Sequence, residues 1–165
     1  MIIDQKRAHE RILYESYLLN LSMGPVSTQQ ELFPQSIDLS AGDLALLSSL
    51  VDDLATLGVS ISFLGQNTIS VNALPANLKI SSPEQLIHDF INSFKEDVGN
   101  QSIDVHQKLS KALAKASSIP YNRKLEPIEM QDLVDKLFAC QFPSISPDGK
   151  PTITTITTDE LDKRF

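Results

Sequence analysis

Apolar residues recur three and four positions apart through much of this chain, which is the spacing of one face of an α-helix. The pattern predicts helices over roughly residues 5–19, 40–57, 83–98 and 103–118 and from Pro127 through Phe138. Ser40, with Asp43 three residues on, is expected to cap the second helix, and Gly58 to end it. The clearest helix begins at Ser82-Pro83, and its apolar face consists of Leu86, Ile87, Phe90, Ile91 and Phe94.

Alternation of apolar and polar residues predicts two strands, Val59–Phe63 and Thr68–Ala73, on either side of a turn at Gly65. We expect them to form a hairpin whose buried face carries Ile69 and Val71. Shorter strands are expected at residues 1–4, 36–39 and 152–157, and a last short helix is expected to be capped by Thr158. Helices and strands in this mixed order indicate an α+β fold.

The composition is typical of a cytoplasmic protein that binds other proteins. With 165 residues and 41% hydrophobic content, the chain is long enough for one domain or two small subdomains. It has no apolar stretch of membrane-spanning length and no secretion signal at its start. The single cysteine, Cys140, excludes an internal disulfide and is expected to be an inert, partly buried thiol. A net charge of -7 argues against strong direct binding to DNA.

The first fifteen residues carry the most distinctive motif. A short apolar run ends at Asp4 and leads into Gln5-Lys6-Arg7-Ala8-His9-Glu10, with a further acid at Glu15. This string resembles the D-Q-H-A-x-x-E-x-x-x-x-E motif in the C-terminal domain of the MutL family of DNA mismatch-repair proteins. The segments Leu57 to Thr68, Val71 to Pro75 and Gly149 to Ile153 resemble further family segments in the same order. The resemblance therefore covers essentially the whole chain.

In the nuclease members of this family, acids, histidines and cysteines at these motifs hold catalytic metal. Here the histidine position of the opening motif is Lys6. The family's A-C-R segment aligns with residues 114–116 and its C-P-H-G-R-P segment with residues 146–151, so the two cysteine positions are Lys115 and Ser146 and the second histidine position is Asp148. Asp4 and Glu10 remain, with Asp148 as a further oxygen donor, so these three are weak candidates for holding Mg²⁺ or Mn²⁺. A lysine ammonium repels a divalent ion and offers it no lone pair. We therefore expect neither a catalytic site nor a bound metal or other cofactor.

The same residues also have a purely structural interpretation, which we favour. Asp4 and Glu10 suit the first turns of a helix, where carboxylates cap free N–H groups and complement the helix dipole. Lys6 is four residues from Glu10, the spacing at which opposite charges pair on a helix surface. For His9 we expect a partly exposed helical position without a metal.

Gln29-Gln30-Glu31-Leu32-Phe33 is a candidate docking peptide. It resembles the Q-x-x-L-F peptides with which bacterial repair and replication proteins bind the sliding clamp. Leu32 and Phe33 would be apolar anchors and Gln29 a hydrogen-bonding group at the rim, presented by a flexible loop before the strand at Ser36. The alternative is that Leu32 and Phe33 pack into the local core.

The resemblance also implies a division into two subdomains. Residues 1–22 and 101–165 would form a dimerisation subdomain with a mixed sheet and packed helices, and residues 23–100 an inserted, mostly helical regulatory subdomain. The implied function is a non-catalytic module that forms a homodimer in mismatch repair. It would contact the sliding clamp and other mismatch-repair proteins, but nucleic acid only weakly or indirectly. Two alternatives remain open: a metal-dependent DNA-nicking endonuclease domain, and a monomeric clamp-docking adaptor.

Overall fold

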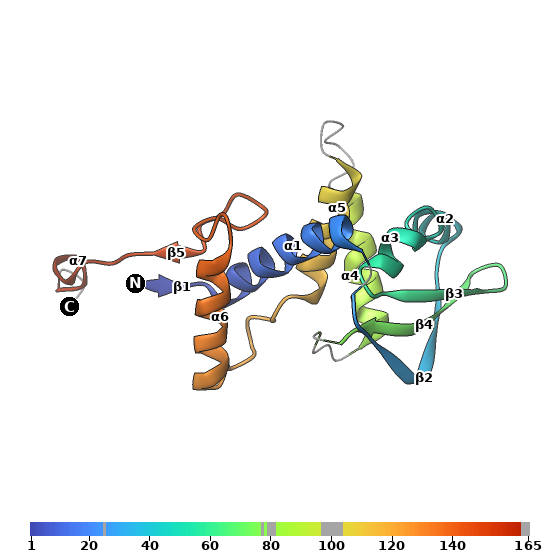
Figure 1. Ribbon diagram of the computed structural model, residues 1–165, viewed down its shortest axis with the longest axis horizontal. Coiled ribbons are helices and arrows are strands. Elements are labelled where there is room, and N and C mark those ends of the chain that lie inside the picture. The colour runs from blue at the N-terminus through green and yellow to red at the C-terminus, as the bar shows by residue number, and fades with distance from the viewer. Residues whose placement is uncertain (25, 77, 79–81, 97–103, 163–165) are drawn as a thin grey trace. The chain divides into compact units, whose positions relative to one another are not determined.

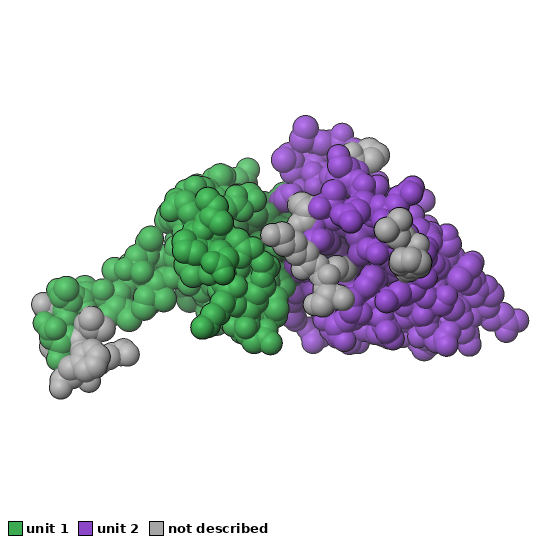
Figure 2. All heavy atoms as spheres, turned by 90° about the horizontal axis from the view of Figure 1, so that it is seen from below, with its two compact units in different colours: residues 1–15, 118–165 green, residues 16–117 purple. Residues whose placement is uncertain are grey.

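The computed structural model describes residues 1–24, 26–76, 78, 82–96 and 104–162, with only the backbone described at residues 32, 33, 159 and 161 (Figure 1). The chain forms two compact units, coloured separately in Figure 2. Unit 1 consists of Met1–Glu15 and Ser118–Phe165, and unit 2 consists of Ser16–Ser117. Within the described residues, no helix has the length and apolar character needed to cross a membrane.

Unit 1 combines a short sheet with two helices that share a core. β1 (Ile2–Ile3) pairs antiparallel with β5 (Ile153–Thr154), and the chain continues from β1 into α1 (Gln5–Met23), which ends in unit 2. α6 (Pro127–Ala139) begins with a capping box between Glu126 and Glu129, and α7 (Thr158–Asp162) follows β5. The core consists of Ala8, Leu125, Leu133 and Leu137, with Ile3, Ile12, Ile119 and Ile153 packed against it.

Unit 2 contains a three-stranded antiparallel sheet in the order β2-β4-β3. The strands are β2 (Thr28–Asp38), β3 (Ser60–Leu64) and β4 (Thr68–Pro75). β3 and β4 form the predicted hairpin, and its turn contains Gly65 at φ +73. Ile69 and Val71 of β4 are fully buried, as their alternation with polar residues predicts.

In the described residues of unit 2, the sheet is accompanied by the end of α1 and by α2 (Ala41–Ser49), α3 (Val51–Thr56), α4 (Pro83–Glu96) and α5 (Val105–Ser117). The Ser40 hydroxyl caps α2 by accepting a hydrogen bond from the Asp43 amide at 3.2 Å. Hydrogen bonds from Lys95 and Ser40 hold the pKa of the Asp43 carboxyl below its usual value. α4 packs on α5, and all five predicted apolar residues of α4 are buried.

The α+β class is confirmed, but several elements differ from the predictions. The helix expected over residues 40–57 is two helices, and the bend at Leu50 leaves Leu47, Leu50, Leu54 and Leu57 all buried. The strand expected at residues 36–39 is much longer, because it pairs with β4 from Thr28 onward. The last strand covers only Ile153–Thr154, since its partner β1 is equally short. The hydroxyl that caps α7 belongs to Thr157 and not to the predicted Thr158. The helix end predicted at residues 99–100 lies outside the described residues.

The two compact units also divide the chain at other places than the resemblance implies. They separate between residues 15 and 16 and between residues 117 and 118. α5 and the end of α1 therefore belong to unit 2, whereas the implied division groups residues 16–22 and 101–117 with the two ends of the chain.

Candidate functional site

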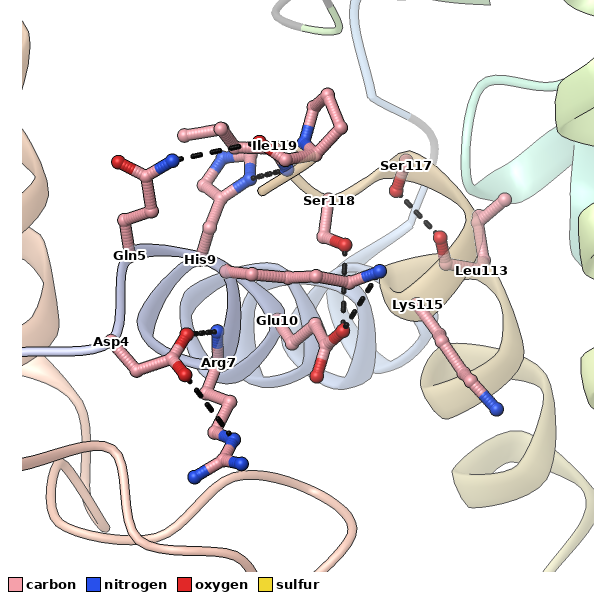
Figure 3. A network of polar contacts seen from close by, with 12 residues as sticks. Asp4, Gln5, Arg7, His9, Glu10, Leu113, Lys115, Ser117, Ser118 and Ile119 are labelled. Atoms are coloured by element: carbon pink, nitrogen blue, oxygen red, sulfur yellow. Dashed lines mark hydrogen bonds and ion pairs between the residues drawn. The ribbon is translucent and has the colours of Figure 1, made fainter. Parts of the chain in front are cut away.

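Asp4 forms the N-terminal cap of α1 in unit 1. Its carboxylate accepts a hydrogen bond from the Arg7 amide through Oδ1 at 3.0 Å and pairs with Arg7 Nε through Oδ2 at 3.4 Å (Figure 3). The Asp4 amide donates to the carbonyl of Thr152 at 2.9 Å, which joins the cap to the segment before β5. The Arg7 guanidinium also donates to the carbonyl of Pro151 at 3.0 Å. Both oxygens of Asp4 are thus engaged by its own helix.

Glu10 is buried, and its carboxylate faces a lysine. The Lys6 ammonium lies 3.9 Å from Glu10 Oε1, and the hydroxyl of Ser118 donates to the same oxygen at 3.5 Å. Lys6 also lies over the ring of Tyr121, 5.4 Å from its centroid. The ammonium of Lys6 is therefore held between a carboxylate and an aromatic face.

An open hollow of about 700 Å³ in unit 1 borders this region. It is lined by Asp4, Gln5, Tyr121, Asn122, Arg123, Lys124, Leu125 and Met130. The lining contains one carboxylate and two cationic side chains, which is the reverse of what a divalent cation requires. Across the described residues, no three side chains of His, Cys, Asp or Glu gather closely enough to share a metal ion.

His9 and Gln5, one helical turn apart, hold the segment that follows Ser118. His9 Nδ1 accepts a hydrogen bond from the Ile119 amide at 3.1 Å (Figure 3). The Gln5 side-chain amide donates to the carbonyl of Arg123 at 2.8 Å. Burial first, and then the positive charges of Lys136 and Arg123, lower the pKa of His9 to about 4. The ring is therefore neutral at pH 7 and acts as a backbone acceptor.

Lys115, Ser146 and Asp148 stand at the remaining metal-ligand positions of the family, and the contacts of Lys115 and Ser146 are with other parts of the fold. Lys115 belongs to α5 in unit 2, where its ammonium pairs with Glu96 at 2.7 Å. Ser146 is buried in unit 1, and its hydroxyl accepts from the Lys150 amide at 3.2 Å to close a tight turn. Asp148 is exposed in the same turn. In unit 1 Asp4 and Glu10 each face a basic residue of α1, Arg7 and Lys6.

Glu15 has a role that its spacing in the motif did not reveal. Its carboxylate accepts hydrogen bonds from the amides of Gln141 at 2.7 Å and Phe142 at 3.2 Å, and it pairs with Arg11 at 3.4 Å. It therefore anchors the chain just after α6. Burial and the nearby charge of Glu15 raise the pKa of the Cys140 thiol to about 11, which keeps this thiol protonated and poorly reactive.

The candidate docking peptide lies in a strand, so the expectation of a flexible loop is wrong. β2 is an edge strand, and Gln29 and Gln30 pair with Leu74 and Ala73 of β4. Pairing then stops and resumes only at Gln35, opposite Val71. Residues 31–34, which include Leu32 and Phe33, therefore lie opposite the single residue 72, in an irregular bulge of β2.

The sequence of this chain is similar to one known protein family and to several named proteins. Residues 1–125 match the family model described as the MutL C terminal dimerisation domain. The DNA mismatch repair protein MutL of Parabacteroides distasonis is 38% identical over 168 residues, covering 99% of this chain and 27% of that protein. The MutL proteins of Bacteroides fragilis and Chloroherpeton thalassium are 35% and 36% identical over 165 residues, covering 100% of this chain and 26% of each protein. The chain spans about a quarter of the length of these relatives, and it belongs to the family of MutL C-terminal dimerisation domains.

Proposed function

We propose that this chain is the homodimerisation module of a MutL-type mismatch-repair protein and has no nuclease activity. The family description supports the dimer, and the names of the curated relatives support the role in mismatch repair. Holding two protomers together raises the local concentration of whatever else each protomer carries. Such a role requires a stable interface and no reactive group.

The ion pair between Lys6 and Glu10 is the observation that carries the non-catalytic part of the proposal. With the ammonium 3.9 Å from Glu10 Oε1, a divalent ion at this carboxylate would have to displace a resident positive charge. At Asp4 it would have to displace Arg7, which engages both carboxylate oxygens. Asp4 and Glu10 therefore do not fit a divalent metal ion, because each carboxylate already forms an ion pair with a basic side chain of the same helix.

Nicking of supercoiled plasmid in the presence of Mn²⁺ tests the proposal that the chain has no nuclease activity. We expect the wild-type chain and its Asp4→Asn variant to produce no more nicked plasmid than buffer does. Asparagine still caps a helix well, so this variant removes the charge while keeping the local fold. Manganese-dependent nicking by the wild type that disappears in Asp4→Asn would overturn the proposal and support the endonuclease alternative.

We propose further that the bulge of β2 docks the sliding clamp. The bulge supports this function because residues 31–34 leave the ladder of an edge strand, where an extended segment is accessible to a partner protein. Their sequence, with Leu32 and Phe33 after the glutamine pair, supplies two apolar anchors. Residues 28–30 and 35–38 on either side of the bulge are held by pairing with β4, which would reduce the conformational entropy that the bulge loses on binding.

Titration of a purified bacterial sliding clamp against the labelled chain tests the docking proposal. The double variant Leu32→Ala with Phe33→Ala should weaken binding by roughly 100-fold, since two anchors are lost. The matched control is Gln35→Ala with Ser36→Ala, which changes two exposed residues of the same strand just beyond the bulge. Unchanged clamp affinity in the Leu32 and Phe33 variant, or no binding by the wild type, would refute clamp docking without affecting the dimer.

A further inference from the structure

The bulge of β2 cannot close by a slip of the strand along β4. The four residues 31–34 lie opposite the single residue 72, so three residues of β2 are in excess. Closing the bulge would shift the strand beyond it by these three residues, and a shift by an odd number turns every side chain to the other face of the sheet. Ile37, which is 2% exposed and pairs with Ile69, would then leave the core. The burial of Ile37 therefore keeps residues 31–34 out of the ladder.

Both ends of the bulge are held by local features of the sequence. Pro34 is exposed and directly precedes Gln35, where pairing with β4 resumes. A proline has no N–H group to donate to a ladder, and its ring fixes φ at about −65°. Before the bulge, Thr28 packs closely on the backbone of Gly58, where a Cβ atom would lie 3.2 Å from Thr28 Cγ2. The bulge thus begins and ends at defined positions.

β4 is irregular at the same place on its other side. Ser60 of β3 pairs with Ala73 and Ile61 pairs with Val71, so Asn72 is an extra residue of β4. Among the described pairs of this sheet, Asn72 has a partner neither in β2 nor in β3. An extra residue of this kind bends its strand and increases the local twist. The central strand therefore bends at the residue that lies opposite the four unpaired residues of β2.

Two hydrogen bonds fix the side chain of Asn72. Its Oδ1 accepts from the hydroxyl of Ser70 at 3.2 Å, and its Nδ2 donates to the hydroxyl of Ser62 at 2.6 Å. Ser70 and Ser62 are paired residues of β4 and β3, so Asn72 joins the irregular position to the regular part of the hairpin. Loss of these hydrogen bonds would let β4 straighten and would give the unpaired segment of β2 more conformations.

We propose that Asn72 is a positioning residue of the docking site, which holds β4 in the bent conformation that keeps residues 31–34 displayed as an extended segment. This inference rests on the proposed docking of the sliding clamp and assigns to it a residue outside the docking peptide. A segment whose backbone is already ordered loses less conformational entropy on binding. The chain should then bind the clamp more tightly than the same residues do in a free peptide.

Titration of a purified bacterial sliding clamp with the chain and with a synthetic peptide of residues 28–38, the span of β2, measures this ordering. The peptide contains the whole docking sequence but lacks β4. The chain should bind at least about 10-fold more tightly, because only the peptide must order its backbone on binding. Equal affinities would overturn the inference and leave clamp docking intact. Absence of binding by both would overturn clamp docking, and this inference with it.

Asn72→Ala and Ser62→Ala remove the two partners of one hydrogen bond. Each should weaken clamp binding by roughly fivefold, and the double variant should bind no more weakly than Asn72→Ala, because the two residues act through one contact. None of these variants should bind more weakly than the free peptide, which has no β4 at all. The control is Asn67→Ala, which changes an exposed asparagine in the turn of the same hairpin and should bind within about twofold of the wild type.

Circular dichroism first shows that each variant is folded at the temperature of the titration. Wild-type affinity in folded Asn72→Ala would overturn the inference. A double variant whose loss of affinity is the product of the two single losses would overturn the role of the contact between Asn72 and Ser62. If Asn72→Ala does not fold, Ser62→Ala provides the test, since it changes only an exposed hydroxyl.

Discussion

At the scale of single residues, polar side chains of the opening motif form hydrogen bonds with backbone groups of distant segments. His9 and Gln5 bind the amide of Ile119 and the carbonyl of Arg123, and Glu15 binds the amides of Gln141 and Phe142. Each of these contacts joins α1 to a segment more than 100 residues away in the sequence. The polar side chains of the motif therefore assemble unit 1.

The neutral state of His9 predicts a defined pH dependence of stability. Because its pKa in the folded chain is about 4, below the ordinary histidine pKa of 6.5, the unfolded chain binds this proton more readily. The contribution of His9 is complete above about pH 6.5 and is lost as the pH falls toward 4, by at most on the order of 3 kcal/mol. Between about pH 7 and pH 5, urea unfolding should show a larger loss of stability for the wild type than for His9→Gln, which cannot titrate. Equal losses would contradict the assigned role.

At the scale of elements, the junction of α3 and β3 depends on one glycine. Gly58 has φ +88, and a Cβ atom there would lie 2.9 Å from Val26 Cγ2 and 3.2 Å from Thr28 Cγ2. Gly58→Ala should therefore lower the free energy of unfolding by about 2–4 kcal/mol, through backbone strain and the clash. Gly65→Ala, at φ +73 with open space around the added atom, should cost only about 1 kcal/mol. Equal effects in chemical unfolding would show that the packing around Gly58 is not tight.

How far the sequence predicts the elements depends on where their partners lie. α4 and α6 are predicted well, because their caps and apolar stripes are local. β2 is predicted only in part, since the polar run at Thr28-Gln29-Gln30 becomes a strand only by pairing with β4, more than 40 residues away. In the candidate site, the pairing of Lys6 with Glu10 follows from their spacing. The backbone partners of Gln5 and His9 could not be predicted, because they lie more than 100 residues away in the sequence.

At the scale of the whole molecule, the two units suit different parts of the proposed function. Unit 1 contains the two acids of α1 that pair with basic residues, and unit 2 contains the bulged edge strand. A net charge of -7 favours separation of identical chains unless an apolar interface opposes it. The proposed function therefore depends first on whether two copies associate.

The most direct test is sedimentation equilibrium of the wild-type chain over a wide range of concentrations, at an ionic strength of about 0.15 M to screen its net charge. The account predicts the mass of a dimer that persists down to low micromolar concentration, about twice the 18.2 kDa of one chain. A mass of 18.2 kDa at every concentration would contradict the homodimer proposal.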